Sequence, residues 1–199
     1  MVAGRDRLGG GTWMAMRGGL VAAVLNRPGS LGPAPDKLSR GELPLLAVGH
    51  ASAREAASAM QVLDAGAYRT FNMVVADRAS AHFVRGLGAG RVEGWALPPG
   101  VHIVTAHDPD DPASARGIVH LPRFQAAPAP DPGQDDWMAW INLLSDASGG
   151  ATAINVPARD GFGTVCSSLV GLPAEGPPMW LFAAGPPDQT PFQRVHLAS

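Results

Sequence analysis

The chain has 199 residues, of which 46% are hydrophobic, and a formal net charge of −2, so it is long enough to bury a sizeable core and does not have the composition of a disordered protein. Lysine and arginine form no cluster, which argues against the basic face of a nucleic-acid-binding protein. The single cysteine, Cys166, excludes an intrachain disulfide, and the longest apolar run near the start, residues 20–25, is far shorter than the ~20 residues that span a bilayer.

The first sixty residues predict a hairpin followed by two capped helices. Short β-like runs at residues 12–16 and 20–26 flank Arg17-Gly18-Gly19 and indicate antiparallel pairing. The segment Ser39-Arg40-Gly41-Glu42 has the spacing of a capping box, but Pro44 follows closely, so this helix should be short or distorted. A second capping box at residues 52–55 predicts a helix that runs to about Leu63.

The rest of the chain alternates between strands and helices in blocks. Strands are expected at residues 71–76, 81–85, 91–97 and 101–106, then a short helix at 118–124, a helix at 137–144, and strands at 151–156, 164–172, 179–184 and 192–197. Closely spaced strands favour antiparallel pairing. We therefore predict an α+β protein with a single domain over residues 1–199, located in the cytoplasm and without membrane or nucleic-acid partners.

Several kinds of site are not indicated by the sequence. The familiar nucleotide-binding, zinc-protease and serine-hydrolase motifs are absent, and the six histidines lack the spacing of metal ligands. The only lysine, Lys37, lies in a Pro/Gly-rich loop that does not favour pyridoxal chemistry. We expect the acidic residues Asp108, Asp110 and Asp111 to form a solvated turn, and Cys166 to be a buried, unreactive strand residue.

A series of short motifs remains, and their order is more specific than any one of them. They are Ala3-Gly4-Arg5-Asp6, Gly10-Gly11-Thr12-Trp13, Val24-Leu25-Asn26-Arg27, Ser39-Arg40-Gly41-Glu42-Leu43, Phe71-Asn72-Met73-Val74-Val75-Ala76-Asp77 and Gly161-Phe162-Gly163-Thr164 with Ser167-Ser168. In this order the chain resembles the NRDE family, also called the transport and Golgi organisation protein 2 family, from about residue 3 to about residue 195.

The resemblance implies a scaffold like that of N-terminal-nucleophile hydrolases, with two packed antiparallel sheets and helices outside. Members of that family begin Met-Cys, and the processed cysteine would supply both the thiol nucleophile and the α-amino base. The present sequence starts Met1-Val2 and enters the pattern after the position of the Asn-Arg-Asp-Glu tetrad that gives the family its name. We therefore expect an N-terminally incomplete domain. We favour a misplaced start codon or a fragment over a lineage that lost the front of the domain. Loss of those strands would expose unpaired backbone N–H and C=O groups at the edge of the sheet.

Three functions follow as hypotheses from the resemblance. The chain could handle a small ligand without catalysis, with Asp6, Trp13, Asn72, Thr164 and Ser167 as candidate pocket residues. The complete protein could hydrolyse amides, with Asn26 as an oxyanion donor and Arg40 as a carboxylate binder, although Asn26 is equally suited to capping a strand end. The family is also connected with haem trafficking and, in animals, with Golgi organisation. No haem-ligand motif is readable, no other cofactor is expected, and the oligomeric state stays open.

Overall fold

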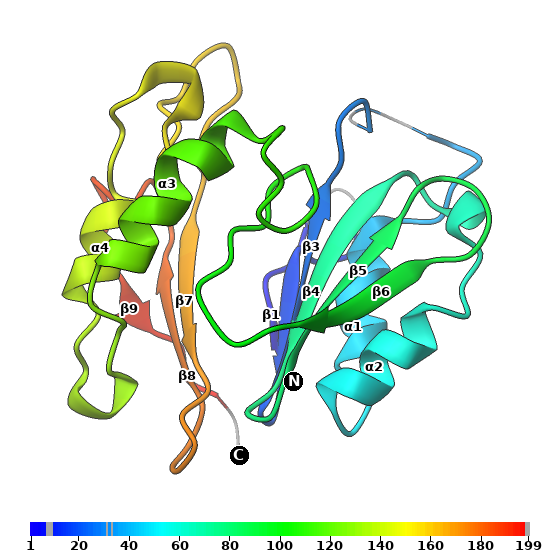
Figure 1. Ribbon diagram of the computed structural model, residues 1–199, viewed down its shortest axis with the longest axis horizontal. Helices are drawn as coiled ribbons and strands as arrows, with labels where there is room; N and C mark the ends of the chain where they lie inside the picture. Colours follow the sequence, from blue (N-terminus) through cyan, green and yellow to red (C-terminus); the bar gives the residue numbers. More distant parts are fainter. Residues whose placement is uncertain (7–9, 31, 33, 198–199) are drawn as a thin grey trace. The chain divides into compact units, whose positions relative to one another are not determined.

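The computed structural model describes residues 1–6, 10–30, 32 and 34–197, and the chain divides into two compact units. The first unit holds Met1–Gly100 and Val104–Pro109, and the second holds Val101–Ile103 and Asp110–Leu197. Each unit has its own antiparallel sheet and its own helices (Figure 1). The predicted α+β class is confirmed. The prediction that residues 1–199 form one domain stays a prediction.

The first unit is built on a six-stranded antiparallel meander. Its strands lie in chain order: β1 (Val2–Ala3), β2 (Met14–Arg17), β3 (Leu20–Asn26), β4 (Phe71–Ala76), β5 (Ala81–Gly86) and β6 (Glu93–Leu97). The predicted hairpin is confirmed, because Arg17 pairs with Leu20 across a two-residue turn. Gly18 in that turn has a φ of 58°, a conformation that costs a glycine little.

Two capped helical segments follow the hairpin, as predicted. The Ser39 hydroxyl accepts a hydrogen bond from the Gly41 N–H and starts a 3-10 turn, η1 (Arg40–Glu42), which leads into the short helix α1 (Leu43–Ala47). The Ser52 hydroxyl accepts from the Glu55 N–H at 3.2 Å and starts α2 (Ala53–Met60). Helix α2 ends three residues before the predicted end at Leu63.

The core of the first unit lies between the sheet and these two helices, which cover one sheet face in Figure 1. Alternate residues of β4, namely Phe71, Met73 and Val75, are completely buried there. On the helix side, α2 contributes Ala56 and Met60, one turn apart. A second 3-10 turn, η2 (Ala65–Ala67), connects α2 to β4. These alternate residues of β4 therefore face the helices.

The second unit combines two helices with a three-stranded antiparallel sheet. Its elements are α3 (Ala115–Ala126), η3 (Pro132–Gln134), α4 (Met138–Leu144), η4 (Gly150–Thr152), β7 (Ser167–Gly171), β8 (Met179–Ala183) and β9 (Gln193–Arg194). As predicted, Trp137, Trp140, Ile141 and Leu144 share one helix face, and they pack with Leu169 and Leu181 of the sheet. Helix α3 is longer than the predicted 118–124, because the Ser114 hydroxyl caps it earlier by accepting from the Gly117 N–H.

Two predicted strands are wrong. Residues 101–106 are irregular, because the side chain of Asn72 donates to the carbonyl oxygens of Thr105 and His107, which therefore do not join a ladder. Residues 151–156 hold η4 and irregular backbone. In that segment the carbonyls of Thr152 and Ala153 are bound by side chains of α3.

The predictions for Cys166 and for the acidic cluster also need correction. Cys166 is exposed and lies just before β7, not inside a strand. The strand starts later than predicted because the Thr164 hydroxyl and N–H both bond to the Val156 backbone. Asp108 is not simply solvated, since it forms ion pairs with Arg27 (2.7 Å) and Arg85.

Within the described residues, every helix is too short or too polar to cross a membrane.

Candidate functional site

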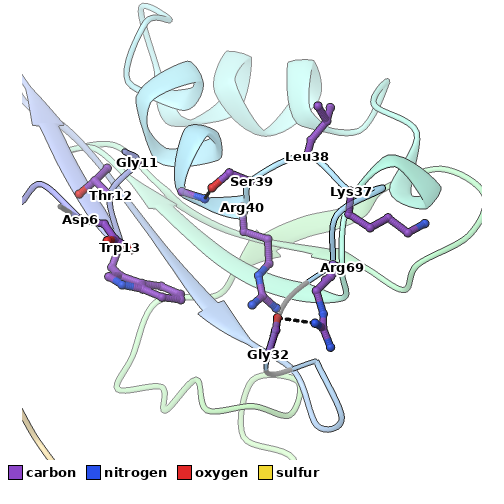
Figure 2. A pocket seen from close by; sticks show the side chains of 12 residues that line it. Asp6, Gly11, Thr12, Trp13, Gly32, Lys37, Leu38, Ser39, Arg40 and Arg69 are labelled. Atoms are coloured by element: carbon purple, nitrogen blue, oxygen red, sulfur yellow. Dashed lines mark hydrogen bonds between the residues drawn. The ribbon is translucent and has the colours of Figure 1, made fainter. Parts of the chain in front are cut away.

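A pocket of about 370 Å³ lies in the first unit (Figure 2). Its described lining comes from the loop before β2, from the loop between β3 and η1, and from the segment just before β4. The charged and aromatic groups on these segments are Asp6, Trp13, Lys37, Arg40 and Arg69. We call this cavity the Trp13–Arg40 pocket. Its size suits one small organic molecule.

Two glycines bring the loops of the pocket together. The Thr12 N–H donates to the Gly41 carbonyl at 2.8 Å. A Cβ atom on Gly11 would lie 2.6 Å from the carbonyl carbon of Gly41, so a side chain at this position would collide with backbone. The Gly-Gly-Thr-Trp and Ser-Arg-Gly-Glu motifs, which are separate in the sequence, therefore meet as one wall of the pocket.

Asp6 is held beside this wall by its own backbone. Its N–H donates to the Gly11 carbonyl at 2.8 Å, and its carbonyl accepts from the Gly10 N–H at 2.9 Å. Trp13 follows directly and is 51% exposed. A tryptophan this exposed offers a flat apolar surface to a ligand, because little protein covers the ring.

Two hydrogen bonds hold Arg40 in the pocket wall. Its Nη1 donates to the Ser30 hydroxyl at 2.8 Å and to the Thr70 carbonyl at 2.9 Å. Partial burial lowers the pKa of Arg40 from its ordinary value, and the positive charge of Arg69 lowers it further. Arg40 forms no ion pair with any carboxylate in the described part of the chain. A desolvated guanidinium beside a like charge favours the approach of an anion.

The other two cations differ in direction. Arg69 donates to the Gly32 carbonyl, a bond drawn in Figure 2, and its side chain extends the same way as that of Arg40. The Lys37 amine donates to the Gly66 carbonyl and points away from Arg40. Arg40 and Arg69 are therefore the cations that a ligand in the pocket would meet.

The hydroxyl groups of the lining are already committed to the backbone. The Thr12 hydroxyl donates to the Met14 carbonyl at 2.7 Å and accepts from the Met14 N–H. The Ser39 hydroxyl accepts from the Gly41 N–H at 3.2 Å. Among the described residues, neither hydroxyl is hydrogen-bonded to the basic side chain that activates a nucleophile. The described lining is thus equipped for binding.

The structure brings together three of the predicted site residues, Asp6, Trp13 and Arg40. Asn26 ends β3 and Asn72 lies on β4, and neither lines the pocket. The carboxamide oxygen of Asn26 is buried without a hydrogen-bond partner among the described residues. Thr164 and Ser167 belong to the second unit. There the Thr164 hydroxyl accepts a hydrogen bond from the Val156 N–H, and Ser167 begins β7.

Asn72 has a different part in the fold. It is completely buried, accepts from Arg27 Nη1 at 2.5 Å, and donates to the carbonyls of Thr105 (3.0 Å) and His107 (2.6 Å). All of these groups lie in the first unit. With its amide fully used by the protein, Asn72 holds residues 104–109 against the sheet.

Sequence reasoning missed Arg69 and the residue that holds Arg40, Ser30. Arg69 directly precedes a predicted strand, and Ser30 lies in a Pro/Gly-rich loop, so neither stands in a motif. The sequence signal for this region was the Ser39-Arg40 helix start, because a charged side chain in the first turn of a helix lies next to the loop that precedes it. Among the described residues, His, Cys, Asp and Glu side chains do not gather in threes as a metal site requires.

Comparison with known proteins supports the resemblance. The sequence profile of the family described as Transport and Golgi organisation 2 matches residues 1–119, which include every segment that lines the Trp13–Arg40 pocket. None of the curated proteins matches the chain. The matched region is more than half of the 199 residues. The chain belongs to the Transport and Golgi organisation 2 family.

Proposed function

We propose that this protein binds a small organic anion in the Trp13–Arg40 pocket. The observation that carries the proposal is Arg40: partly buried, beside the charge of Arg69, and without an ion-paired carboxylate among the described residues. Charges removed from water are usually paired, because desolvation disfavours the charged form. A bound anion would compensate the desolvation of Arg40 and its repulsion from Arg69 at once.

Haem is a candidate through the family, and the described lining fits it only in part. Haem iron is normally held by His, Cys, Met or Tyr. The described residues that line the pocket include none of these side chains. Arg40 and Arg69 suit the carboxylates of such a molecule, but the pocket does not suit its iron. We therefore propose that the pocket recognises a ligand through its acid groups.

Amide hydrolysis is the second candidate function, carried over from the N-terminal-nucleophile scaffold that the family suggests. Its favourable observation is that Arg40 could hold a substrate carboxylate. Against it, Asn26 lies outside the pocket lining, and the described hydroxyls there are bound to backbone. Turnover of a panel of small carboxylated amides by the protein would favour this candidate over binding alone.

The test compares Arg40→Gln with Arg54→Gln, because Arg54 is an exposed residue of α2 outside the pocket and loses the same charge. Thermal melting is measured with and without small organic acids. A ligand at 100 times its Kd stabilises a protein by about 2.7 kcal/mol. We expect this stabilisation in the wild type and in Arg54→Gln, and its loss in Arg40→Gln. Equal stabilisation of all three proteins would contradict the proposal.

A further inference from the structure

We propose that the Trp13–Arg40 pocket is selective for a planar aromatic carboxylate, an inference that rests on the proposed anion-binding function. Three observations define the ligand chemistry. They are the orientation of Arg40, the net positive charge of the lining, and the exposed ring of Trp13.

Arg40 presents one edge of its guanidinium group. Nη1 is held by the Ser30 hydroxyl and the Thr70 carbonyl, while Nε and Nη2 make no hydrogen bond within the described part of the chain. These two nitrogens form a planar pair of donors, and a carboxylate has two oxygens with the matching spacing. The free edge of Arg40 therefore fits a planar two-oxygen acceptor.

Ser30 is the positioning residue for this edge. It is only 3% exposed, and its hydroxyl donates to the Arg27 carbonyl at 2.7 Å, so its oxygen is left to accept from Arg40. A hydroxyl fixed at both ends restricts rotation of the guanidinium group. Less orientational freedom is then lost when a ligand binds.

The charge of the lining favours an anion. Arg40 and Arg69 contribute two positive charges, and Asp6 contributes a negative one. Coulomb energy scales with charge for attraction as well as for repulsion, so the net charge of these three groups attracts an anion. The planar donor edge of Arg40 then matches the two oxygens of a carboxylate.

Trp13 defines the remainder of the ligand. Its indole is 51% exposed and points toward the guanidinium end of Arg40 in Figure 2. Aromatic rings pack favourably in offset or edge contacts, beyond the area that they bury. With about 370 Å³ available, one aromatic ring and its carboxylate can be accommodated.

The experiment measures Kd by calorimetry on the full chain with three probes: benzoate, cyclohexanecarboxylate and phenyl phosphate. We expect benzoate to bind about tenfold more tightly than cyclohexanecarboxylate, the effect of one good aromatic contact. In Trp13→Leu that preference should disappear while both carboxylates still bind. In Arg40→Lys, which keeps the charge but not the planar edge, benzoate should bind about tenfold more weakly.

Ser30→Ala tests the positioning role separately. It should weaken benzoate binding less than Arg40→Lys does, and Ser30→Thr should restore it by returning a hydroxyl. Tighter binding of phenyl phosphate than of benzoate, with dependence on Arg40, would overturn the carboxylate assignment but leave the anion site intact. An unchanged ring preference in Trp13→Leu would overturn the role of Trp13. Lack of binding by all three probes would overturn the proposed function as well.

Discussion

Asp77 shows how one side chain can connect two elements of the first unit. Its carboxylate accepts from the Ala53 N–H at the start of α2, at 2.7 Å, and from the N–H groups of Ala79 and Ser80 in the β4–β5 turn. Burial by itself raises the pKa of Asp77, but these three hydrogen bonds and the charge of His82 outweigh it and hold the pKa below its ordinary value.

We expect Asp77→Ala to cost about 2 kcal/mol at neutral pH, the upper end for a lost helix cap. Because the pKa is lowered in the folded state, the stabilisation is complete above pH ~4 and is lost as the pH falls through the folded value. Urea unfolding between pH 7 and pH 3 measures the difference. Asp36→Ala, at an exposed position, is the control. A cost that stays constant down to pH 3 would argue against the charged hydrogen bonds.

Cys166 gives a second prediction at the scale of a single residue. The side chain is exposed, yet surrounding atoms partly desolvate the thiol and raise its pKa. A thiol reagent should therefore modify the folded protein stoichiometrically, slowly at pH 7 and faster as the pH rises, since the thiolate reacts. Mass spectrometry of the native protein measures the rate, with Cys166→Ser as the blank. Modification that requires denaturant would show that the thiol is inaccessible.

At the scale of elements, the contact between the loop before β2 and the start of η1 determines the shape of the pocket. Gly11 and Gly41 approach each other through backbone atoms, and each lacks the Cβ that would separate them. A hydrogen bond from Thr12 to Gly41 closes the same contact. Position 11 requires a residue without a side chain, and it does not use the conformational freedom of glycine.

Gly11→Ala should therefore destabilise the protein by about 1–3 kcal/mol, the range for overpacking against groups that cannot move easily. It should also weaken ligand binding, because the two loops carry Trp13 and Arg40. Gly19→Ala is a matched control, since a Cβ there meets nothing within 4 Å. Melting temperature and ligand affinity are measured on both variants. If Gly11→Ala behaves like Gly19→Ala in both, the loop contact does not support the pocket.

At the scale of the whole molecule, the chain passes between its two units near residues 100–110. Residues 104–109 belong to the first unit, and the three residues before them belong to the second. Asn72 binds this segment through Thr105 and His107, and Arg27 and Arg85 bind it through Asp108. A polar network of this kind holds in place a segment that does not pair with a β-strand.

We expect Asn72→Ala to cost about 3 kcal/mol, because it removes the hydrogen bond from Arg27 and the two hydrogen bonds to the carbonyls of Thr105 and His107. Amide hydrogen exchange should increase within residues 104–109 and change little in the second unit. Asn142→Ala, on the exposed side of α4, should leave both stability and exchange close to wild type. Unchanged exchange at residues 104–109 would mean that other contacts hold the segment.

Much of the local structure follows from the sequence because its causes are local. The Gly18-Gly19 turn and the Ser39 and Ser52 caps each depend on neighbouring residues. The α+β class and the family follow from these patterns and from the order of the motifs. Three pocket residues, Asp6, Trp13 and Arg40, could be selected in the same way.

The tertiary structure alone decided which polar groups meet. Asn72 was a pocket candidate, but its amide binds backbone that lies far along the chain, and that backbone was predicted to be a strand. Arg69 joins Arg40 only because the sheet places the start of β4 beside the loop after β3. Cys166 is exposed because the Thr164–Val156 contact delays the start of β7. Each outcome depends on a contact between residues that are not neighbours in the sequence, and local sequence patterns do not encode such contacts.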